Sequence, residues 1–325
     1  MANRIGLKVA AIVLASASVF TACSTPAAPS AGTDASGGAT KTLKIGVTFP
    51  ILDQFLQKVA DAITAEAKAK GVEVNIVAAE EKTDTQLGQV ENFVSQKVDG
   101  IIVIPVDTDA AGPMTDAAKS ANIPLVYVNR KPADLPSGVP YVGSDSLYAG
   151  TVEMQELAKL AGGTGNVVIL QGDPANEAAV QRTKGCNDVV AQNPGMKVIK
   201  TQAGNWYREK GQSIMENWLQ SGDDIKVVCA NNDEMALGAI NAIKADNKKL
   251  GADGILVGGV DATADALAAM GAGDLAVTVF QDAAGQGKGG LDAVVDLAGG
   301  QTVKDYVDIP YQLVTPDNMA DFAGK

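Results

Sequence analysis

Nine residues that follow short apolar runs in this sequence belong to types that recognise polar molecules. They are Asp53, Phe55, Asn129, Arg130, Arg182, Trp206, Asn232, Asp261 and Gln281. Carboxylate, amide and guanidinium groups form paired hydrogen bonds, and aromatic rings present flat apolar faces. This combination would bind a small ring that has C–H bonds on its faces and hydroxyl groups at its rim. We therefore predict that the nine residues bind a ligand.

Each residue of this set also has a purely structural explanation. Asp53, Asn232 and Asp261 could cap the helices that begin beside them, because Asp and Asn accept hydrogen bonds from the first turn of a helix. Phe55 could belong to the core, and both arginines could form surface ion pairs. These alternatives stay open for the single residues, whereas the set as a whole favours a binding site.

The two tryptophans differ in their surroundings. Trp218 lies in the apolar stripe of a helical run, which predicts that it packs in the core. Trp206 stands in the polar segment AGNWYREKG, where packing does not require a large ring. Trp206 is therefore the candidate for stacking on a ligand.

The composition excludes several classes of function. Histidine is absent, so Ser-His-Asp and Cys-His catalytic groups and His-containing metal sites cannot form. The formal net charge of -12 argues against a nucleic-acid partner. No phosphate-binding GxxxxGKS/T loop and no GxSxG motif occurs, and the GGTG segment at 162–165 precedes a strand instead of following one. We predict a protein that is not an enzyme and needs no cofactor or metal.

From Leu43 onward, short apolar runs alternate with longer runs of helical periodicity, as in repeated βα units. A helix is expected at Asp53–Lys70 with Gly71 as its C-terminal cap. The run IIVIP at 101–105 is apolar at every position, which is typical of a parallel strand covered on both faces. Further strands are expected at 43–48, 72–78, 125–128, 166–170, 197–201, 226–230, 255–259 and 276–280.

These units are too many for one ordinary sheet core. We therefore predict an α/β fold of two similar, doubly wound parallel-sheet lobes with a ligand cleft between them. A closed (βα)8 barrel is the competing architecture. Pro and Gly clusters near 137–143 and after Phe280 favour two lobes, because they indicate crossings between lobes.

The N-terminal segment is predicted to be a signal peptide at residues 1–22. Arg4 and Lys8 form a basic region, and an apolar stretch and small residues follow. Cys23 ends a segment that resembles a bacterial lipobox, so its thiol is predicted to carry a lipid. The rest of 23–41 is rich in Ser, Pro, Ala and Gly and is expected to be a flexible tether.

Two further cysteines, Cys186 and Cys229, fall in a predicted helix and at the end of a predicted strand. Export would permit a disulfide between them. Nothing in the sequence places the two residues within bonding distance, and we expect two buried thiols that pack as small apolar side chains.

Beyond these patterns, residues 43–315 resemble the periplasmic monosaccharide-binding proteins of ABC importers, the family of the galactose-, ribose- and inositol-binding components. The segments NNDEMALGA from Asn231 and VGGVDATADAL from Val257 carry the resemblance, together with the spacing from Asp261 to Gln281. Asn176 stands where the galactose-binding members have a histidine, and no acidic calcium loop occurs between 160 and 166.

The resemblance implies roles for the nine residues. Asp53 would accept hydrogen bonds from sugar hydroxyls, while Phe55 and Trp206 would stack on opposite faces of the sugar ring. The remaining six would form the polar rim: Asn129, Arg130, Arg182, Asn232, Asp261 and Gln281. Gln281 matches the ribose-binding members at its position.

The resemblance also implies how the protein works. It predicts a three-segment hinge near Ser146, Asp282 and Pro310, with lobes formed by 42–146 plus 282–310 and by 147–281 plus 311–325. Closure around a monosaccharide would present the protein, expected to be an exported and lipid-anchored monomer, to an ABC transporter permease. The alternative is a receptor that reports a sugar-like signal to a membrane sensor. Hexose, pentose, inositol and furanose ligands stay open, and the aromatic pair with Asp53 favours a pyranose or cyclitol.

Overall fold

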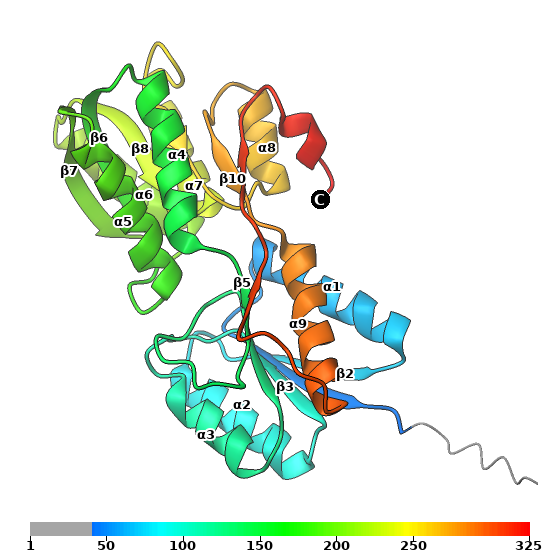
Figure 1. Cartoon of the computed structure of the whole chain (residues 1–325). Coiled ribbons are helices and arrows are strands. Elements are labelled where there is room, and N and C mark those ends of the chain that lie inside the picture. Colours follow the sequence, from blue (N-terminus) through cyan, green and yellow to red (C-terminus); the bar gives the residue numbers. More distant parts are fainter. Residues whose placement is uncertain (1–40) are drawn as a thin grey trace, which may run out of the picture. The chain divides into compact units, whose positions relative to one another are not determined.

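The structure is a computed structural model that describes residues 41–325. The predicted signal peptide, Cys23 and the tether, apart from Lys41, lie outside the described residues. In the described part, strands and helices alternate and form two lobes, each built on its own sheet (Figure 1). No helix of this part has the length and apolar character needed to cross a membrane. The two-lobed α/β fold predicted from the sequence is confirmed, and the closed barrel is excluded.

The first lobe is a six-stranded parallel sheet with the order β11-β5-β4-β3-β1-β2. Side chains of its central strand alternate between two cores. Ile102 packs with α1 and α9, whereas Ile101 and Val103 pack with α2 and α3, which explains why every position of this run is apolar. The elements of this lobe are β1 (Lys44–Phe49), α1 (Gln54–Lys70), β2 (Glu73–Ala78), α2 (Thr83–Gln96), β3 (Gly100–Val103), α3 (Gly112–Ser120), β4 (Leu125–Val128), β5 (Tyr141–Gly143), α9 (Ala283–Ala298) and β11 (Tyr306–Asp308).

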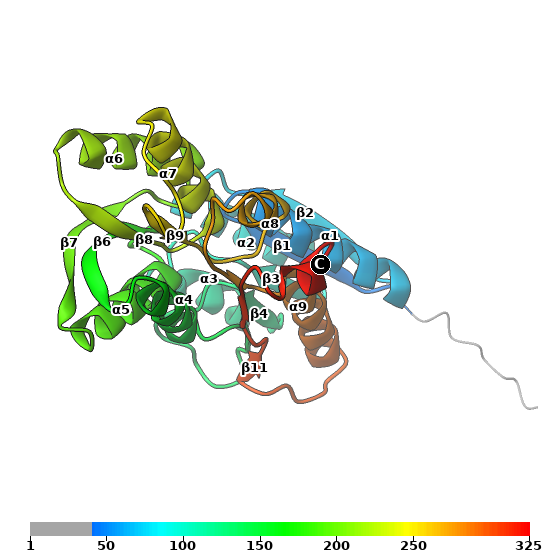
Figure 2. The ribbon, with the colours of Figure 1, turned by 90° about the horizontal axis from the view of Figure 1, so that it is seen from above.

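The second lobe has a parallel sheet with the order β7-β6-β8-β9, extended by β10 and β12. In Figure 2, α6 and α7 lie on one side of this sheet and α4 and α5 lie on the other. Trp218 is buried in the core beneath α6 and α7, as predicted. The elements are α4 (Ser146–Leu160), β6 (Thr164–Gln171), α5 (Glu177–Ala191), β7 (Gly195–Ala203), α6 (Arg208–Gln220), β8 (Ile225–Ala230), α7 (Asp233–Ala245), β9 (Leu256–Gly258), α8 (Ala264–Gly271), β10 (Thr278–Phe280), β12 (Gln312–Val314) and the 3-10 helix η1 (Met319–Phe322).

The chain passes between the lobes three times in the described residues: from β5 to α4, from β10 to α9 and from β11 to β12 (Figure 1). The sequence patterns did not predict β5, β11 or β12. β12 is antiparallel to β10, because a strand that enters the lobe from a crossing runs away from the cleft. The other strands run toward the cleft and place their carboxyl ends there.

The expectation of two free thiols is wrong. Cys186 of α5 and Cys229 of β8 form a disulfide, with their Cα atoms 6.7 Å apart. Helix and strand are distant in sequence, but α5 packs directly on the face of β6 and β8 that holds Cys229. This tertiary contact brings the two sulfurs together, and no local sequence pattern records it.

Candidate functional site

All nine predicted site residues line one cavity between the two lobes. The first lobe contributes the beginning of α1 and the segment after β4, and the second lobe contributes α5 and the segments that follow β7, β8, β9 and β10. The positions agree with the rule that ligands bind beyond the carboxyl ends of parallel strands. Leu56 and Ala178 complete the lining. That these residues bind a ligand stays a prediction, whereas their convergence is a feature of the structure.

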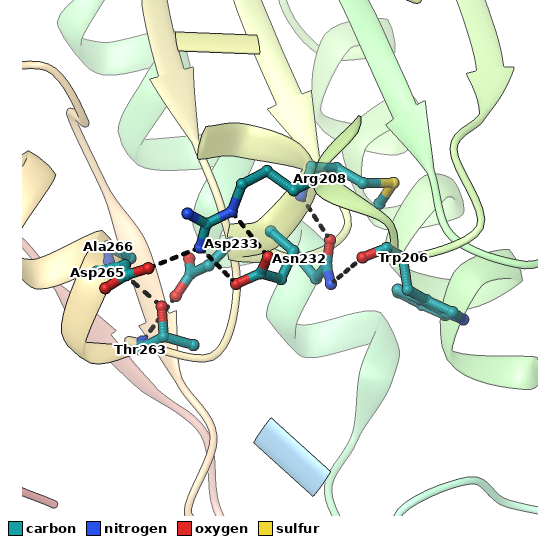
Figure 3. Close-up of polar contacts among 9 residues, drawn as sticks. Trp206, Arg208, Asn232, Asp233, Thr263, Asp265 and Ala266 are labelled. Atoms are coloured by element: carbon teal, nitrogen blue, oxygen red, sulfur yellow. Dashed lines mark hydrogen bonds and ion pairs between the residues drawn. The ribbon is translucent and has the colours of Figure 1, made fainter. Parts of the chain in front are cut away.

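Asp53 and Asn232 both cap a helix and face the cavity. The Asp53 Oδ1 accepts a hydrogen bond from the Leu56 N–H of α1 at 2.7 Å. The Asn232 Oδ1 accepts from the Met235 N–H of α7, and its Nδ2 donates to the Trp206 carbonyl oxygen at 3.1 Å (Figure 3). Burial raises the pKa of Asp53, opposed by the Leu56 N–H. Capping and ligand binding are therefore compatible roles, because the cap fixes where the second polar atom points.

Asp261 does not cap a helix. Thr263 caps α8 by accepting from the Ala266 N–H (Figure 3). Asp261 has a φ of 124°, an unusual value for a non-glycine residue, and its carboxylate makes no hydrogen bond within the described residues. Burial raises its pKa well above the ordinary value, and Arg182 opposes the rise. A carboxylate held this way gains most from a ligand that donates hydrogen bonds to it.

Arg182 is buried, so the surface ion pair considered for it is wrong. Its Nη1 donates to the Asn231 carbonyl oxygen at 2.7 Å, and its Nη2 donates to the Gln281 Oε1 at 2.5 Å and the Tyr311 Oη at 2.6 Å. Its Nε is buried without a partner in the described residues. Burial alone would lower its pKa, yet the net direction is upward because Tyr311 and Asp261 lie beside it. The unpaired N–H is a donor available to a ligand.

Arg130 is also buried, but its partners are backbone carbonyl groups. Its Nη1 lies 3.2 Å from the Pro105 oxygen and 3.4 Å from the Val106 oxygen. Burial lowers its pKa, while the nearby carboxylates of Glu81 and Asp53 raise it. Its Nε and Nη2 make no hydrogen bond within the described residues and can donate within the cavity.

The Trp206 ring lies against Gly172, which the sequence did not indicate as a site residue. A Cβ atom at Gly172 would stand 2.2 Å from the Trp206 Cη2 atom, so no larger residue fits beneath the ring. Trp206 itself has a φ of 72°. The Arg182 guanidinium carbon lies 5.7 Å from the ring centre, within the range of a cation–π contact. Phe55 faces the cavity from the opposite lobe and also belongs to the first-lobe core.

Two further residues hold the polar groups in place. The Tyr311 hydroxyl accepts from Arg182 and donates to the Gln281 Oε1 at 2.8 Å, which ties two crossing segments to α5. Asn129 donates through Nδ2 to the Gln286 Oε1 of α9 at 3.0 Å. Neither Tyr311 nor Gln286 follows a predicted strand, and their roles depend on contacts between distant segments.

Beside the cavity, Arg208 links three helices of the second lobe (Figure 3). Its Nε and Nη2 donate to the two Glu234 oxygens, each at 2.8 Å, and Nη2 also contacts Asp265 at 2.8 Å. The bidentate bond to Glu234 raises the pKa of Arg208. These contacts fix the N-termini of α6, α7 and α8, whose caps include Asn232.

Among the described residues, one group of side chains has the spacing of metal ligands: Glu153, Cys186 and Cys229. Its two sulfur atoms are joined in the disulfide, so they are not available as the thiolates that bind a metal. Glu153 is buried, which raises its pKa well above the ordinary value. This group therefore lacks the donors of a metal site.

Comparisons with known proteins agree with this architecture. A family model for the periplasmic binding protein domain matches residues 45–302. A protein named for rhizopine binding in Rhizobium meliloti is 46% identical over 260 residues, which cover 78% of this chain and 84% of that protein. A xylitol-binding protein of Mycolicibacterium smegmatis is 36% identical over 279 residues, which cover 86% and 78% of the two chains.

A solved structure shows the same fold. An ABC transporter solute-binding protein of Bacillus halodurans with bound myo-inositol is 41% identical, with a TM-score of 0.84, and the match covers 88% of this chain and 98% of that chain. These relatives are binding proteins and not enzymes, in agreement with the prediction. The family model and the relatives span most of the sequence, and the chain therefore belongs to the periplasmic binding protein family, among its sugar-binding members that serve ABC transporters.

Proposed function

We propose that this protein captures a neutral, polyhydroxylated six-membered ring, a cyclitol or related pyranose, and delivers it to an ABC transporter permease. The observation that carries the proposal is the charge balance of the cavity. Two carboxylates, Asp53 and Asp261, face two guanidinium groups, Arg130 and Arg182, and no other charged side chain lines the cavity formed by the described residues. A ligand with its own net charge would be left without a counter-charge in a buried site.

The shape of the lining supports a ring. Phe55 and Trp206 reach the cavity from opposite lobes, so each can cover one face of a flat ligand. Free donors and acceptors surround them, including the Arg182 Nε and the Asp261 carboxylate. Hydroxyl groups are both donors and acceptors, so a ring bearing several of them can pair with every member of this rim.

Two of the relatives described above support a polyol as the ligand. One is described as xylitol-binding and a solved relative holds myo-inositol. Both molecules carry hydroxyl groups and lack a carbonyl group and a ring oxygen. We therefore place myo-inositol and its stereoisomers first among the candidate ligands of this chain, ahead of hexoses.

The mechanism that follows is closure of two lobes around the ligand. The three crossings lie at 143–146, 280–283 and 308–312, and we propose that the hinge bends there, with the lobe boundaries expected near Ser146, Asp282 and Pro310. Ligand bound to one lobe would attract the groups of the other, and the closed form would be the one that a permease recognises. The lipid on Cys23, export and the monomeric state belong to the same proposal.

Isothermal titration calorimetry of the purified protein tests the proposal. The ligands are myo-inositol, xylitol, glucose, galactose, ribose and, as the charged analogue, myo-inositol 1-phosphate. We expect one neutral ring to bind with one-to-one stoichiometry and the phosphate to bind at least about 100-fold more weakly, because its charge would be buried without a partner. Tighter binding of the phosphate, or no binding of any neutral ring, would contradict the proposal.

A further inference from the structure

Two loops from opposite lobes meet in a group of hydrogen bonds beside the ligand cavity. The segment after β3 belongs to the first lobe, and the segment before α5 belongs to the second. The Thr108 N–H and Oγ1 both donate to the Ala175 carbonyl oxygen at 3.0 Å. The Thr108 Oγ1 also accepts from the Glu177 N–H at 3.2 Å. Thr108 is buried, so these bonds are shielded from water.

Asn176 makes a further bond between the lobes and also contacts a predicted ligand residue. Its Nδ2 donates to the Val106 carbonyl oxygen at 2.9 Å, and its Oδ1 accepts from the Trp206 Nε1–H at 3.2 Å. The orientation of this amide is determined, because the indole N–H can only donate and the carbonyl oxygen can only accept. Asn176 is fully buried and does not line the cavity. Its side chain therefore acts through Trp206 and not on the ligand directly.

The first turn of α5 depends on the other lobe. Asn176 occupies the N-cap position of α5, but its side chain makes no capping bond. The Glu177 N–H is instead satisfied by the Thr108 hydroxyl, which comes from the first lobe. One turn further along the same helix, Arg182 faces the ligand cavity. Separation of the lobes would remove the partners of the Glu177 N–H and of the Asn176 Nδ2, whereas the bond from Trp206 to Asn176 lies within the second lobe.

We propose that Thr108 and Asn176 form a closure latch, in which Asn176 positions the Trp206 ring only when the lobes are together. The latch rests on the proposed function, since it stabilises the closed form around a bound ring. It makes no contact with the ligand, so it adds to affinity by raising the population of the closed form. Loss of latch bonds lowers that population and raises the rate at which the ligand leaves.

The test is stopped-flow binding of myo-inositol to the full chain and its variants, followed through tryptophan fluorescence. Asn176→Ala and Thr108→Val each remove the side-chain bonds that the residue makes between the lobes, whereas the bond from the Thr108 N–H to the Ala175 oxygen remains. Both variants are expected to raise the dissociation rate about ten-fold with little change in the association rate. Asn176→Asp keeps the acceptor for Trp206 but places a carboxylate against the Val106 carbonyl, so it should be as weak as Asn176→Ala. Thr108→Ser keeps the hydroxyl and should restore slow dissociation.

A matched control is Thr64→Val, which makes the same substitution where the hydroxyl bonds within α1 to the Ala60 carbonyl oxygen. Its dissociation rate should equal that of the unmodified protein. A purely structural role of Thr108 would instead make Thr108→Val resemble this control at temperatures well below unfolding. Equal dissociation rates for all the variants would overturn the latch and leave the proposed function standing.

A second readout does not need a ligand. Hydrogen exchange followed by mass spectrometry, without added ligand, reports on the Thr108 and Glu177 N–H groups, which donate across the lobes. We expect faster exchange at 106–110 and 175–179 in Asn176→Ala than in the unmodified protein. If no ring binds but this difference is seen, the latch stands and the proposed ligand class fails. If both segments exchange at equal rates in the two proteins, the latch is wrong.

Discussion

Arg182 and Arg130 face the same cavity from opposite lobes, but their surroundings differ. Arg182 donates at 2.5 to 2.7 Å to an amide, a phenol and a carbonyl group, which link α5 to two crossing segments. Arg130 lies 3.2 and 3.4 Å from two backbone carbonyl oxygens and makes no ion pair within the described residues. The arginine of the second lobe is thus held by mutually bonded side chains, whereas the arginine of the first lobe is held by backbone carbonyl groups.

This difference indicates an order of events. A preorganised set of donors binds a ligand without first being ordered, so its entropic cost of binding is small. We expect the second lobe, with Arg182, Asn232, Asp261 and Gln281, to hold the ligand first. The first lobe then closes and adds Asp53, Phe55, Asn129 and Arg130. Substitutions on the two sides of the cavity test whether the sides are as unequal as their contacts.

The largest effect is expected at the two arginines. Arg182→Met leaves Gln281, Tyr311 and Asp261 without their buried cation. Removing one partner from a buried charged group lowers the free energy of unfolding by about 3 to 5 kcal/mol. We expect ligand binding to be lost and the midpoint of thermal unfolding to fall. Arg130→Met removes weaker bonds, so affinity should fall about ten-fold while the unfolding midpoint changes little.

Calorimetry measures the affinity of both variants, and thermal unfolding measures their stability. Arg182→Lys is the folded control. Lysine keeps the charge but cannot reproduce the forked geometry. Equal losses of affinity and stability in Arg182→Met and Arg130→Met would show that the two sides of the cavity are equivalent.

The next effect concerns the stability of the second lobe. The disulfide joins residues separated by 43 positions, and closing a loop of that size stabilises a protein by about 4 kcal/mol. The double variant Cys186→Ala, Cys229→Ala should therefore unfold at a lower denaturant concentration. The control is the same double variant with added reductant, which should unfold at the same denaturant concentration as without it, because no disulfide is left to reduce. Unchanged unfolding of the double variant would mean that the disulfide does not stabilise the lobe that we consider preorganised.

A smaller loss is expected when the Trp206 ring is displaced without being removed. Gly172→Ala places a methyl group where the ring lies, 2.2 Å from its Cη2 atom. The ring must move, and we expect affinity to fall about 30-fold, or roughly 2 kcal/mol, because stacking is lost. Phe55→Ala on the first-lobe side should weaken binding by a similar factor if both faces of the ligand are covered. Gly88→Ala is the control, since a Cβ atom there meets no neighbour.

Much of the arrangement of the site was predictable, because strands of the structure end close to where the apolar runs of the sequence end. Runs such as IIVIP are apolar on both faces, and the residues after them converge because carboxyl ends of parallel strands share one edge. The three missed strands, β5, β11 and β12, are three residues long each, as are β9 and β10, but they do not lie within the longer apolar runs that marked β9 and β10. Their sequences resemble those of the segments that pass between the lobes, beside which these strands lie.

The features that escaped prediction all depend on distances between segments that are remote in the sequence. Gly172 is required only because the Trp206 ring folds over it. Tyr311 matters because it reaches Arg182, 129 residues earlier in the chain. The disulfide and the bonds of Asn176 to both lobes have the same origin. Local patterns specify elements and their ends, and they do not record which side chains meet once the lobes have assembled.

The smallest expected effect is a pH dependence that arises from a buried carboxyl group of the second lobe. Burial raises the pKa of Asp233 to about 7, although the Thr263 N–H and the Thr278 hydroxyl oppose the rise by donating to it. The carboxyl group therefore binds its proton more tightly in the folded protein than in the unfolded chain. Its contribution to stability is present below pH 4 and is lost as the pH rises through 7.

Between pH 6 and pH 8 this loss amounts to about 1 kcal/mol for a single group with that pKa. Thermal unfolding without ligand should therefore show a lower midpoint at pH 8 than at pH 6, and Asp233→Asn, which cannot ionise, should reduce the difference. Asp261 lies close to Asp233 and its pKa is also raised, so Asp261→Asn is the matched variant. A pH dependence that survives in both variants would place its origin outside the second-lobe side of the cavity. Loss of the dependence in either variant would locate a buried proton in the second lobe, either at Asp261 or at Asp233 beside it.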